Sequence, residues 1–244
     1  MAKFIAQKST EVISLEDFID EMNAYGPDIL AAENIDSVMK RMSALYNNRH
    51  FLTHFFNQNL RDISIQQANL YTFQVFMISR QKYYDLRAPV WFPQVMNKRT
   101  FAYDIAHDHN FDLVTMGYSG SGYTTEIYQY DASQVCGQDG EAINLFNYKK
   151  VTLHEGSVLL YEKNKDLHIQ HPPSDVSVSF NLIKTVNVSD RQYMFDVKNS
   201  CILRKAREPN LAGLLKIAEI IGDEETEHLI NKLNIRKLYE NSKT

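Results

Sequence analysis

Residues 105–130 read IAHDHNFDLVTMGYSGSGYTTEIYQY, which places two histidines one residue apart at the head of an alternating apolar run. Side chains two positions apart in a strand share a face, so we expect His107 and His109 to project together while Asp108 points the other way. Two neighbouring imidazoles on a core-facing strand cost desolvation free energy unless their ring nitrogens find partners, and a metal ion can partner both. This pattern alone leaves two interpretations open, a metal site or a pair of hydrogen-bonded core histidines.

A second informative stretch, residues 153–173, reads LHEGSVLLYEKNKDLHIQHPP. It predicts, in order, a turn at Gly156, a strand over residues 157–162, a polar turn, and a strand over residues 167–170 that carries His168. A third histidine therefore lies on a strand of its own, well separated along the chain from the first pair.

The order of these parts resembles the cupin superfamily. In cupins, a first motif with H-x-H on a strand ends at a glycine turn, and a second motif joins a glycine turn, a short strand and a single histidine. His107, His109 and Gly117 fit the first motif, and Gly156 and His168 fit the second. The resemblance implies a mainly β fold, a double-stranded β-helix barrel in which these three histidines bind one divalent metal.

The match departs from the usual cupin pattern in three places, one of which is that the P-x-G before the second motif reads His154-Glu155-Gly156, without the proline. Cupins commonly carry a glutamate shortly after H-x-H, whereas here Asp112 is the one carboxylate in residues 111–115, and its parity turns it away from the histidines. Pro172 also stands where an asparagine is common after the last histidine. We therefore expect a metal bound by three histidines without a carboxylate.

Helical patterns flank the predicted barrel. Ser14 and Asp17 are placed like a capping box before an apolar stripe, and the pattern over residues 14–60 indicates about three helices. Residues 208–239 are helical again, with Asp223 at the start of the last helix. The expected organisation is an N-terminal helical region (1–66), a cupin-like β-barrel (67–200) and C-terminal helices (201–244).

Alternating, β-branched and aromatic residues predict the strands of the barrel. They span residues 69–79, 83–92, 124–130, 146–153, 157–162, 167–170, 175–185 and 192–197, beside the strand that begins at the first histidine pair.

The glycine-rich run at residues 117–122, GYSGSG, has the spacing of neither a phosphate-binding loop nor a nucleophile elbow. Its glycines instead allow the positive φ values of a tight hairpin turn. On the returning strand, Glu126 and Tyr128 share one face. If that face is turned inward, they are candidate catalytic residues that move protons beside the metal; if it is turned outward, they are surface residues.

Three further polar residues are candidates for binding a substrate. On its predicted strand, an inward-pointing Arg87 would clamp a carboxylate, and the alternative is an ion pair on the outer face. Ser179 and Asn181 share one face of the strand over residues 175–185. Among bulky aromatic residues, these side chains predict a small, polar substrate that carries a carboxylate or an amine, unless they bond only to one another or to water.

The composition limits the partners and the location of the protein. The 244 residues carry a formal net charge of -4 and a pI near 6.1, so there is no basic field to attract nucleic acid. No apolar run reaches the length of a membrane span, and the first residues lack the apolar core of a secretory signal. Cys136 and Cys201 fit a reducing compartment. We expect a cytoplasmic protein without nucleic-acid or membrane partners and, because cupins are often dimers, a homodimer.

The cupin resemblance also implies the kind of function. Three-histidine cupins with open positions on the metal often activate dioxygen, so the first hypothesis is a non-haem Fe(II) oxygenase that acts on a small, polar, amino-acid-like metabolite. Three histidines also accept Zn, Mn, Ni, Co and Cu, and the second hypothesis is an isomerase, lyase or hydrolase that uses such a metal as a Lewis acid. The third is a non-catalytic ligand-binding or regulatory cupin.

Overall fold

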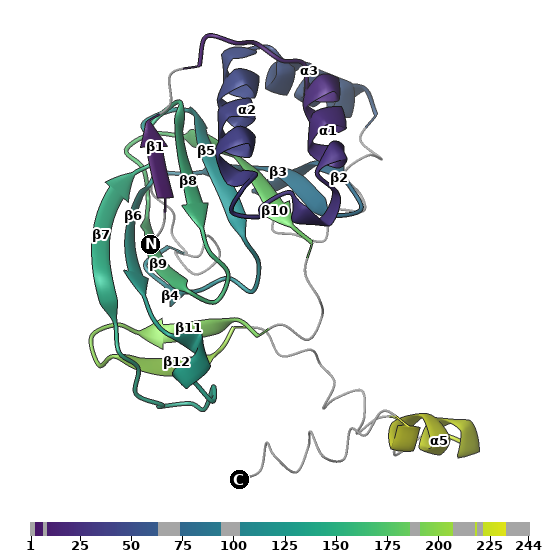
Figure 1. Ribbon diagram of the computed structural model, residues 1–244, viewed down its shortest axis with the longest axis vertical. Coiled ribbons are helices and arrows are strands. Elements are labelled where there is room, and N and C mark those ends of the chain that lie inside the picture. The colour runs from purple at the N-terminus through teal and green to yellow at the C-terminus, as the bar shows by residue number, and fades with distance from the viewer. Residues whose placement is uncertain are drawn as a thin grey trace. The chain divides into compact units, whose positions relative to one another are not determined.

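Two antiparallel sheets of six strands each form the centre of the computed structural model, which describes residues 3–6, 9–62, 74–93, 103–185, 191–206, 218 and 222–232 (Figure 1). The first sheet has the order β1 (Lys3–Ala6), β8 (Ser157–Tyr161), β5 (Leu113–Ser119), β10 (Ser177–Lys184), β3 (Tyr84–Trp91) and β2 (Val75–Arg80). The second has the order β12 (Cys201–Lys205), β11 (Tyr193–Asp196), β4 (Ala106–His107), β9 (Asp166–His171), β6 (Thr124–Gln129) and β7 (Phe146–Thr152). Both sheets belong to the first of two compact units, Met1–Lys205 and Ala206–Thr244.

The strands from β3 to β10 pass back and forth between the two sheets, except that β6 and β7 are consecutive neighbours in the second sheet. Four of them form the order β8-β5-β10-β3 in the first sheet, and the other four form the order β4-β9-β6-β7 in the second. Eight strands in this order make a jelly roll, which is the double-stranded β-helix of cupins. The mainly β, cupin-type fold class expected from the sequence is therefore confirmed.

Most strand predictions are confirmed to within two residues at each end, including those that correspond to β3, β7, β8 and β10. Of the strand predicted over residues 69–79, β2 confirms the second half, and residues 69–73 lie outside the described part of the chain. Two short edge strands, β1 and β12, were not predicted. Each has only four or five residues, too few for alternation to separate a strand from a loop.

Three helices precede the barrel strands, as the sequence predicts: α1 (Leu15–Ala24), α2 (Ile35–Asn47) and α3 (Phe51–Arg61). A short 3₁₀ turn, η1 (Gly26–Asp28), separates the first two. The predicted capping box opens α1, because the amide of Asp17 donates to Ser14 Oγ at 3.0 Å and that hydroxyl donates to Asp17 Oδ2 at 2.8 Å.

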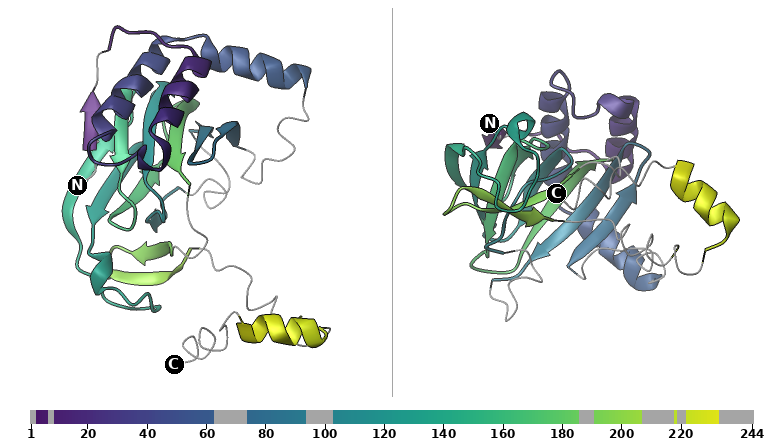
Figure 2. Two further views of the ribbon diagram at one scale, coloured as in Figure 1. Left: turned by 45° about the vertical axis from the view of Figure 1, so that its right-hand side comes forward. Right: turned by 90° about the horizontal axis from the view of Figure 1, so that it is seen from below.

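The helices cover the outer face of the first sheet (Figures 1 and 2). Phe180 of β10 lies under them with 0% of its surface exposed, and its ring meets those of Phe18 and Phe51 edge to face, with centroids 6.0 and 5.5 Å apart. Burial of a phenylalanine contributes about 1.5–3 kcal/mol. The first sheet is thus covered on its outer face by helices, and its other face lines the barrel interior.

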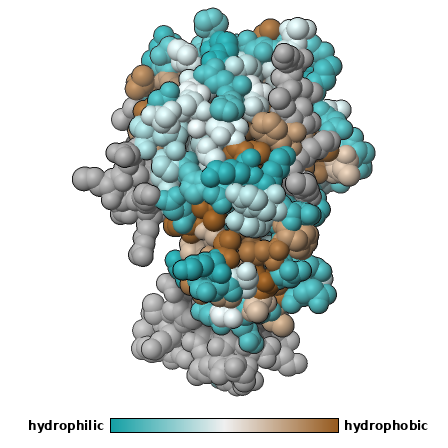
Figure 3. Space-filling model, turned by 90° about the vertical axis from the view of Figure 1, so that its left-hand side faces the viewer, coloured by the Kyte–Doolittle hydropathy of each residue, from teal (hydrophilic) through white to brown (hydrophobic). Residues whose placement is uncertain are grey.

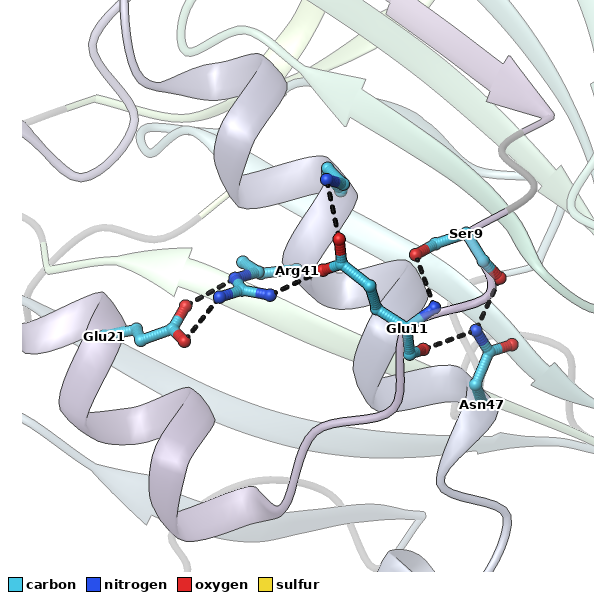
Figure 4. Close-up of polar contacts among 6 residues, drawn as sticks. Ser9, Glu11, Glu21, Arg41 and Asn47 are labelled. Atoms are coloured by element: carbon cyan, nitrogen blue, oxygen red, sulfur yellow. Dashed lines mark hydrogen bonds and ion pairs between the residues drawn. The ribbon is translucent and has the colours of Figure 1, made fainter.

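A polar cluster fixes α1 and the segment before it against α2 (Figure 4). The guanidinium of Arg41 lies between Glu11 and Glu21, with nitrogen–oxygen distances of 2.7 and 2.6 Å. Asn47 Nδ2 donates to the backbone carbonyls of Ser9 and Glu11 at 2.6 and 2.7 Å. Exposed ion pairs contribute little free energy, so the cluster sets the register of these segments while the apolar faces supply the stability.

The second unit contains one described helix, α5 (Glu224–Lys232). Asp223 caps it as the sequence predicts, since the amide of Thr226 donates to Asp223 Oδ1 at 3.0 Å. The rest of the predicted C-terminal helical pattern lies outside the described residues. Among the helices that the structure describes, none has both the length and the apolar character that a bilayer span requires.

Candidate metal centre

The strand order brings the three histidines of the two motifs together. His107 of β4 and His168 of β9 are directly opposite each other in an antiparallel pair, and His109 follows two residues after His107. Their ring centroids are 4.5 Å apart for His107 and His168, 5.2 Å for His107 and His109, and 4.9 Å for His109 and His168. One ring nitrogen from each histidine lies within 4.8 Å of the other two, a cluster that could hold a metal ion.

The hydrogen bonds of the rings fit a metal between them. His107 Nδ1 is 3.0 Å from the carbonyl oxygen of Ile105, which only accepts, so the ring proton belongs on Nδ1 and a lone pair on Nε2. That Nε2 is 3.2 Å from His168 Nε2. Two imidazole nitrogens that each bind one metal at about 2.0–2.1 Å lie roughly 3.0–3.4 Å apart, so these two already have the required separation.

His109 supplies the strongest sign of a missing partner. Both of its ring nitrogens are buried, and neither has a hydrogen-bond partner among the residues that the structure describes. A buried polar nitrogen without a partner costs about 1–3 kcal/mol, and natural folds rarely tolerate it. A metal bound by His109 would remove that cost.

Burial also keeps the three rings neutral. It lowers the pKa of His107, and for His109 and His168 burial, followed by repulsion from the neighbouring histidines, holds the pKa well below the usual range. A neutral imidazole is the form that binds metal, because a protonated ring has no lone pair to donate.

Aromatic side chains line the cluster on the barrel side. The ring of Phe111 stacks on His109 at 4.8 Å, and the ring of Tyr161 is 4.4 Å from that of His168. Ile127 of β6 lies directly opposite His168 in the sheet. These neighbours make the surroundings of the histidines largely apolar, which strengthens any electrostatic interaction inside the site.

Asp108 points away from the histidines, as its parity predicts. It is 0% exposed, and its carboxylate accepts from the Tyr130 hydroxyl and from the Tyr193 amide, each at 2.6 Å. Burial raises the pKa of Asp108 to about 6, although both hydrogen bonds act in the opposite direction. Asp108 thereby fixes the segment that contains His107 and His109 to β11 and to the residue that follows β6.

Of the two orientations left open for Glu126 and Tyr128, the outward one is observed. Thr125, Ile127 and Gln129 are the buried side chains of β6, and the residues between them face the other way. Glu126 contacts His171 Nε2 at 3.0 Å, and the Tyr128 ring packs on Tyr148 with centroids 5.0 Å apart. The expected catalytic position of Glu126 and Tyr128 beside the metal is therefore wrong. Because β6 pairs with β9, Thr125, Ile127 and Gln129 face the barrel interior, and Glu126 and Tyr128 lie on the opposite face of the sheet.

The three candidate substrate-binding residues share the inward face of the first sheet. Arg87 and Asn181 are cross-strand partners, and the residues that alternate with them, such as Leu86 and Leu182, pack under the helices instead. Arg87 is buried and pairs with Asp85 at 2.6 Å, so the ion pair expected as its alternative is present, but not on an outer face.

Hydrogen bonds connect these inward polar groups. Asn181 Oδ1 accepts from the hydroxyls of Thr115 at 2.7 Å and Ser179 at 3.2 Å, and Ser179 Oγ accepts from Trp91 Nε1 at 3.0 Å. These side chains therefore bond to one another, as the alternative interpretation expects. Both hydroxyls donate to Asn181 Oδ1, so they leave the Nδ2 donor of the same amide unused.

The glycines of the two motifs meet at the edge of the barrel. The amide of Gly156 donates to the carbonyl of Gly117 at 2.8 Å, and a Cβ on Gly117 would overlap the backbone of His154. Gly120 and Gly122 have φ values of +87° and +78° in the turn between β5 and β6, so the positive φ values are as predicted. The predicted hairpin is wrong, because β5 and β6 belong to different sheets and this turn connects the two sheets.

No protein-family model and no curated protein sequence matches the chain. Among solved structures it is similar to a DMSP lyase (TM-score 0.32, 12% identity, 50% of this chain and 52% of that one). It is also similar to a hydroquinone 1,2-dioxygenase from Sphingomonas sp. TTNP3 (TM-score 0.32, 11% identity, 50% of this chain and 71% of that one). A third similar structure is the DMSP lyase from Ruegeria pomeroyi DSS-3 (TM-score 0.30, 6% identity, 52% of this chain and 56% of that one). The match thus spans about half the length of the DMSP lyases. On its strand order and its gathered histidines, the chain has the cupin fold, a double-stranded β-helix with a three-histidine cluster inside it.

Proposed function

We propose that the chain is a metal-dependent enzyme, a non-haem Fe(II) oxygenase that acts with dioxygen on a small, polar, amino-acid-like metabolite. One observation carries the proposal: three neutral histidines, two buried and one half-buried, bring ring nitrogens within 4.8 Å of one another, and both nitrogens of His109 lack a partner in the described residues. His107, His109 and His168 would hold the metal.

The three imidazole ligands are compatible with iron, as they are with several other divalent metals. Imidazole suits Fe, Zn, Cu and Ni, and three protein ligands leave positions for a substrate and for dioxygen. When Fe(II) is bound, it supplies the electrons that activate dioxygen. The residues of the chain position the substrate, and Phe111 and Tyr161 exclude water from the reacting atoms.

Metal analysis of the purified protein, followed by anaerobic addition of Fe(II) and measurement of dioxygen uptake with a panel of amino acids, tests this function. We expect about one divalent metal per chain and substrate-dependent uptake with iron. Tightly held zinc without uptake would contradict the oxygenase and favour Lewis-acid chemistry. A protein that binds no divalent metal would contradict the enzyme altogether.

Asn181 and Arg87 would recognise the carboxylate of the substrate, and Ser179 would support them by holding the Asn181 amide in place. Two hydroxyls donate to Asn181 Oδ1, which fixes the amide so that Nδ2 points away from them. The guanidinium of Arg87 lies on the neighbouring strand directly opposite. An amide N–H beside a guanidinium is a donor pair of the kind that binds a carboxylate.

Replacing Asn181 with aspartate should weaken amino-acid binding about tenfold or more, because a donor worth about 1.5–3 kcal/mol to a charged partner becomes a repelling carboxylate. The visible spectrum of the Co(II)-loaded protein, titrated with amino acids, measures the affinity. Asn23→Asp on α1 is the matched control, since it makes the same change of charge on an exposed helix. Equal affinity in the Asn181→Asp protein, or a response only to long apolar compounds, would contradict this substrate class.

We also propose that the chain forms a homodimer. Figure 3 views the side on which β7 lies and shows apolar surface across the middle of that face. Phe146 and Tyr148 of β7 are 41% and 54% exposed, and Tyr148 packs on Tyr128 of the neighbouring strand. Light scattering at micromolar concentration should give twice the mass of one chain, and Tyr148→Glu should shift it toward the monomer mass. A monomeric wild-type protein would contradict the dimer.

A further inference from the structure

The hydroxyl of Thr125 lies between the histidine cluster and a buried tyrosine. Thr125 Oγ1 is 3.5 Å from His168 Nδ1, at the long end of hydrogen bonding, and accepts from the Tyr161 hydroxyl at 3.2 Å. Thr125 and Tyr161 are 0% exposed and His168 is 1% exposed. Buried polar groups are hydrogen-bonded in stable proteins, and the Thr125 hydroxyl is the described group that lies beside His168 Nδ1.

The neighbouring histidine decides which nitrogen of His168 carries the proton. His107 donates from Nδ1 to the Ile105 carbonyl, which leaves a lone pair on its Nε2, 3.2 Å from His168 Nε2. Two lone pairs in contact repel each other. In the metal-free protein His168 therefore carries its proton on Nε2 and donates it to His107, and its Nδ1 accepts from the Thr125 hydroxyl.

We infer that Thr125 is a positioning residue that lets His168 exchange tautomers when the metal of the proposed function binds. A ligating Nε2 has to present a lone pair, so the ring proton moves to Nδ1 and is donated to Thr125 Oγ1. The exchange removes one proton from Nε2 and adds one to Nδ1, and the ring stays neutral. This inference rests on the metal site proposed above.

A hydroxyl suits both states for a simple reason. It has one proton to donate and two lone pairs with which to accept. In the metal-free state Thr125 donates to His168 while it accepts from Tyr161. In the metal-bound state it accepts from His168 and turns its own proton toward the Tyr161 oxygen, and Tyr161 in turn has Tyr123 as a second partner. A carbonyl or a carboxylate at this place would accept only, and would hold His168 in a single tautomer.

Nitrogen NMR of histidine-labelled protein reads the tautomer directly, without any activity assay. In the metal-free wild type we expect a protonated Nε2 on His168, and with Zn(II), a diamagnetic probe, a protonated Nδ1. Thr125→Val keeps the shape but removes the hydroxyl, so zinc affinity should fall by about tenfold or more, the range found for lost partners of metal ligands. Thr125→Ser should restore the affinity.

The neighbouring Thr124 provides the matched control. It faces the other side of β6, where its hydroxyl lies 2.9 Å from that of Thr152, so Thr124→Val should leave both the tautomer and the zinc affinity unchanged. A protonated Nδ1 in the metal-free protein, or Thr125→Val protein that binds zinc as tightly as wild type, would overturn the inference. If the wild-type protein binds no metal, both the proposed function and this inference are wrong. If it binds zinc but His168 keeps the same tautomer, only this inference is wrong.

Discussion

A His168→Ala protein should bind divalent metal at least about 100-fold more weakly than wild type, since even a lost partner of a ligand costs about 10- to 100-fold. His107→Ala and His109→Ala should behave alike, because each removes one of three nitrogens that converge on one point. The fold should remain, because the apolar core between the helices and the first sheet does not include these residues. Metal content after dialysis and thermal melting by circular dichroism measure the two effects.

His171→Ala is the control for this experiment. His171 is also on β9, but it faces the other side of the sheet and contacts Asp104 at 2.8 Å and Glu126 at 3.0 Å. We expect this variant to bind metal as wild type does. Full metal occupancy in the His168→Ala protein would remove His168 from the site.

Gly122→Ala should lower the free energy of unfolding by about 2–5 kcal/mol. Its φ of +78° costs an L-residue about 1–2 kcal/mol, and overpacking typically adds about 1–3 kcal/mol. Here the added Cβ would overlap the backbone carbonyl of Leu153, which cannot move aside as a flexible side chain can. Urea unfolding followed by fluorescence measures the change.

Gly140→Ala separates the two contributions. Gly140 has a similar φ of +82°, but nothing lies within 4 Å of an added Cβ. We expect this variant to lose only the backbone contribution of about 1–2 kcal/mol. If both variants lost the same free energy, the overlap between the added Cβ and Leu153 would not contribute to the destabilisation.

The sequence predicts the strands and the parity of the histidines because each strand has two faces with different surroundings. His107 and His109 project to the same side and Asp108 to the other, as strand parity predicts, although β4 itself ends at His107. Periodicity within one strand carries no information about which distant strand lies beside it. The pairing of His107 with His168 was expected only because the two motifs resemble those of cupins.

The orientation of β6 could not be predicted, because both of its faces carry polar and apolar side chains. Thr125, Ile127 and Gln129 alternate with Glu126 and Tyr128, and neither set is distinctly the more apolar. Pairing with β9 decides between them.

Thr125 and Tyr161 were missed as neighbours of the metal site for a related reason. A threonine and a tyrosine are ordinary strand residues, and nothing in their local pattern distinguishes a position beside a histidine cluster. Their importance follows from pairing between strands: Thr125 lies on β6 next to β9, and Tyr161 lies on the facing sheet. Once a third histidine is placed by a motif, the inward residues of adjacent strands are the ones to examine.

The central place of β10 in the first sheet has a consequence for synthesis on the ribosome. Phe180 of this strand completes the core beneath α1 and α3, yet the chain reaches it only after both helices and most other strands have been made. At typical elongation rates of about 5–20 residues per second, the helices emerge on the order of ten seconds before that strand. During this interval their apolar faces lack their final cover. Nascent chains that end before β10 should therefore bind chaperones and be digested by protease, and protection should appear abruptly once residues 177–184 have left the tunnel.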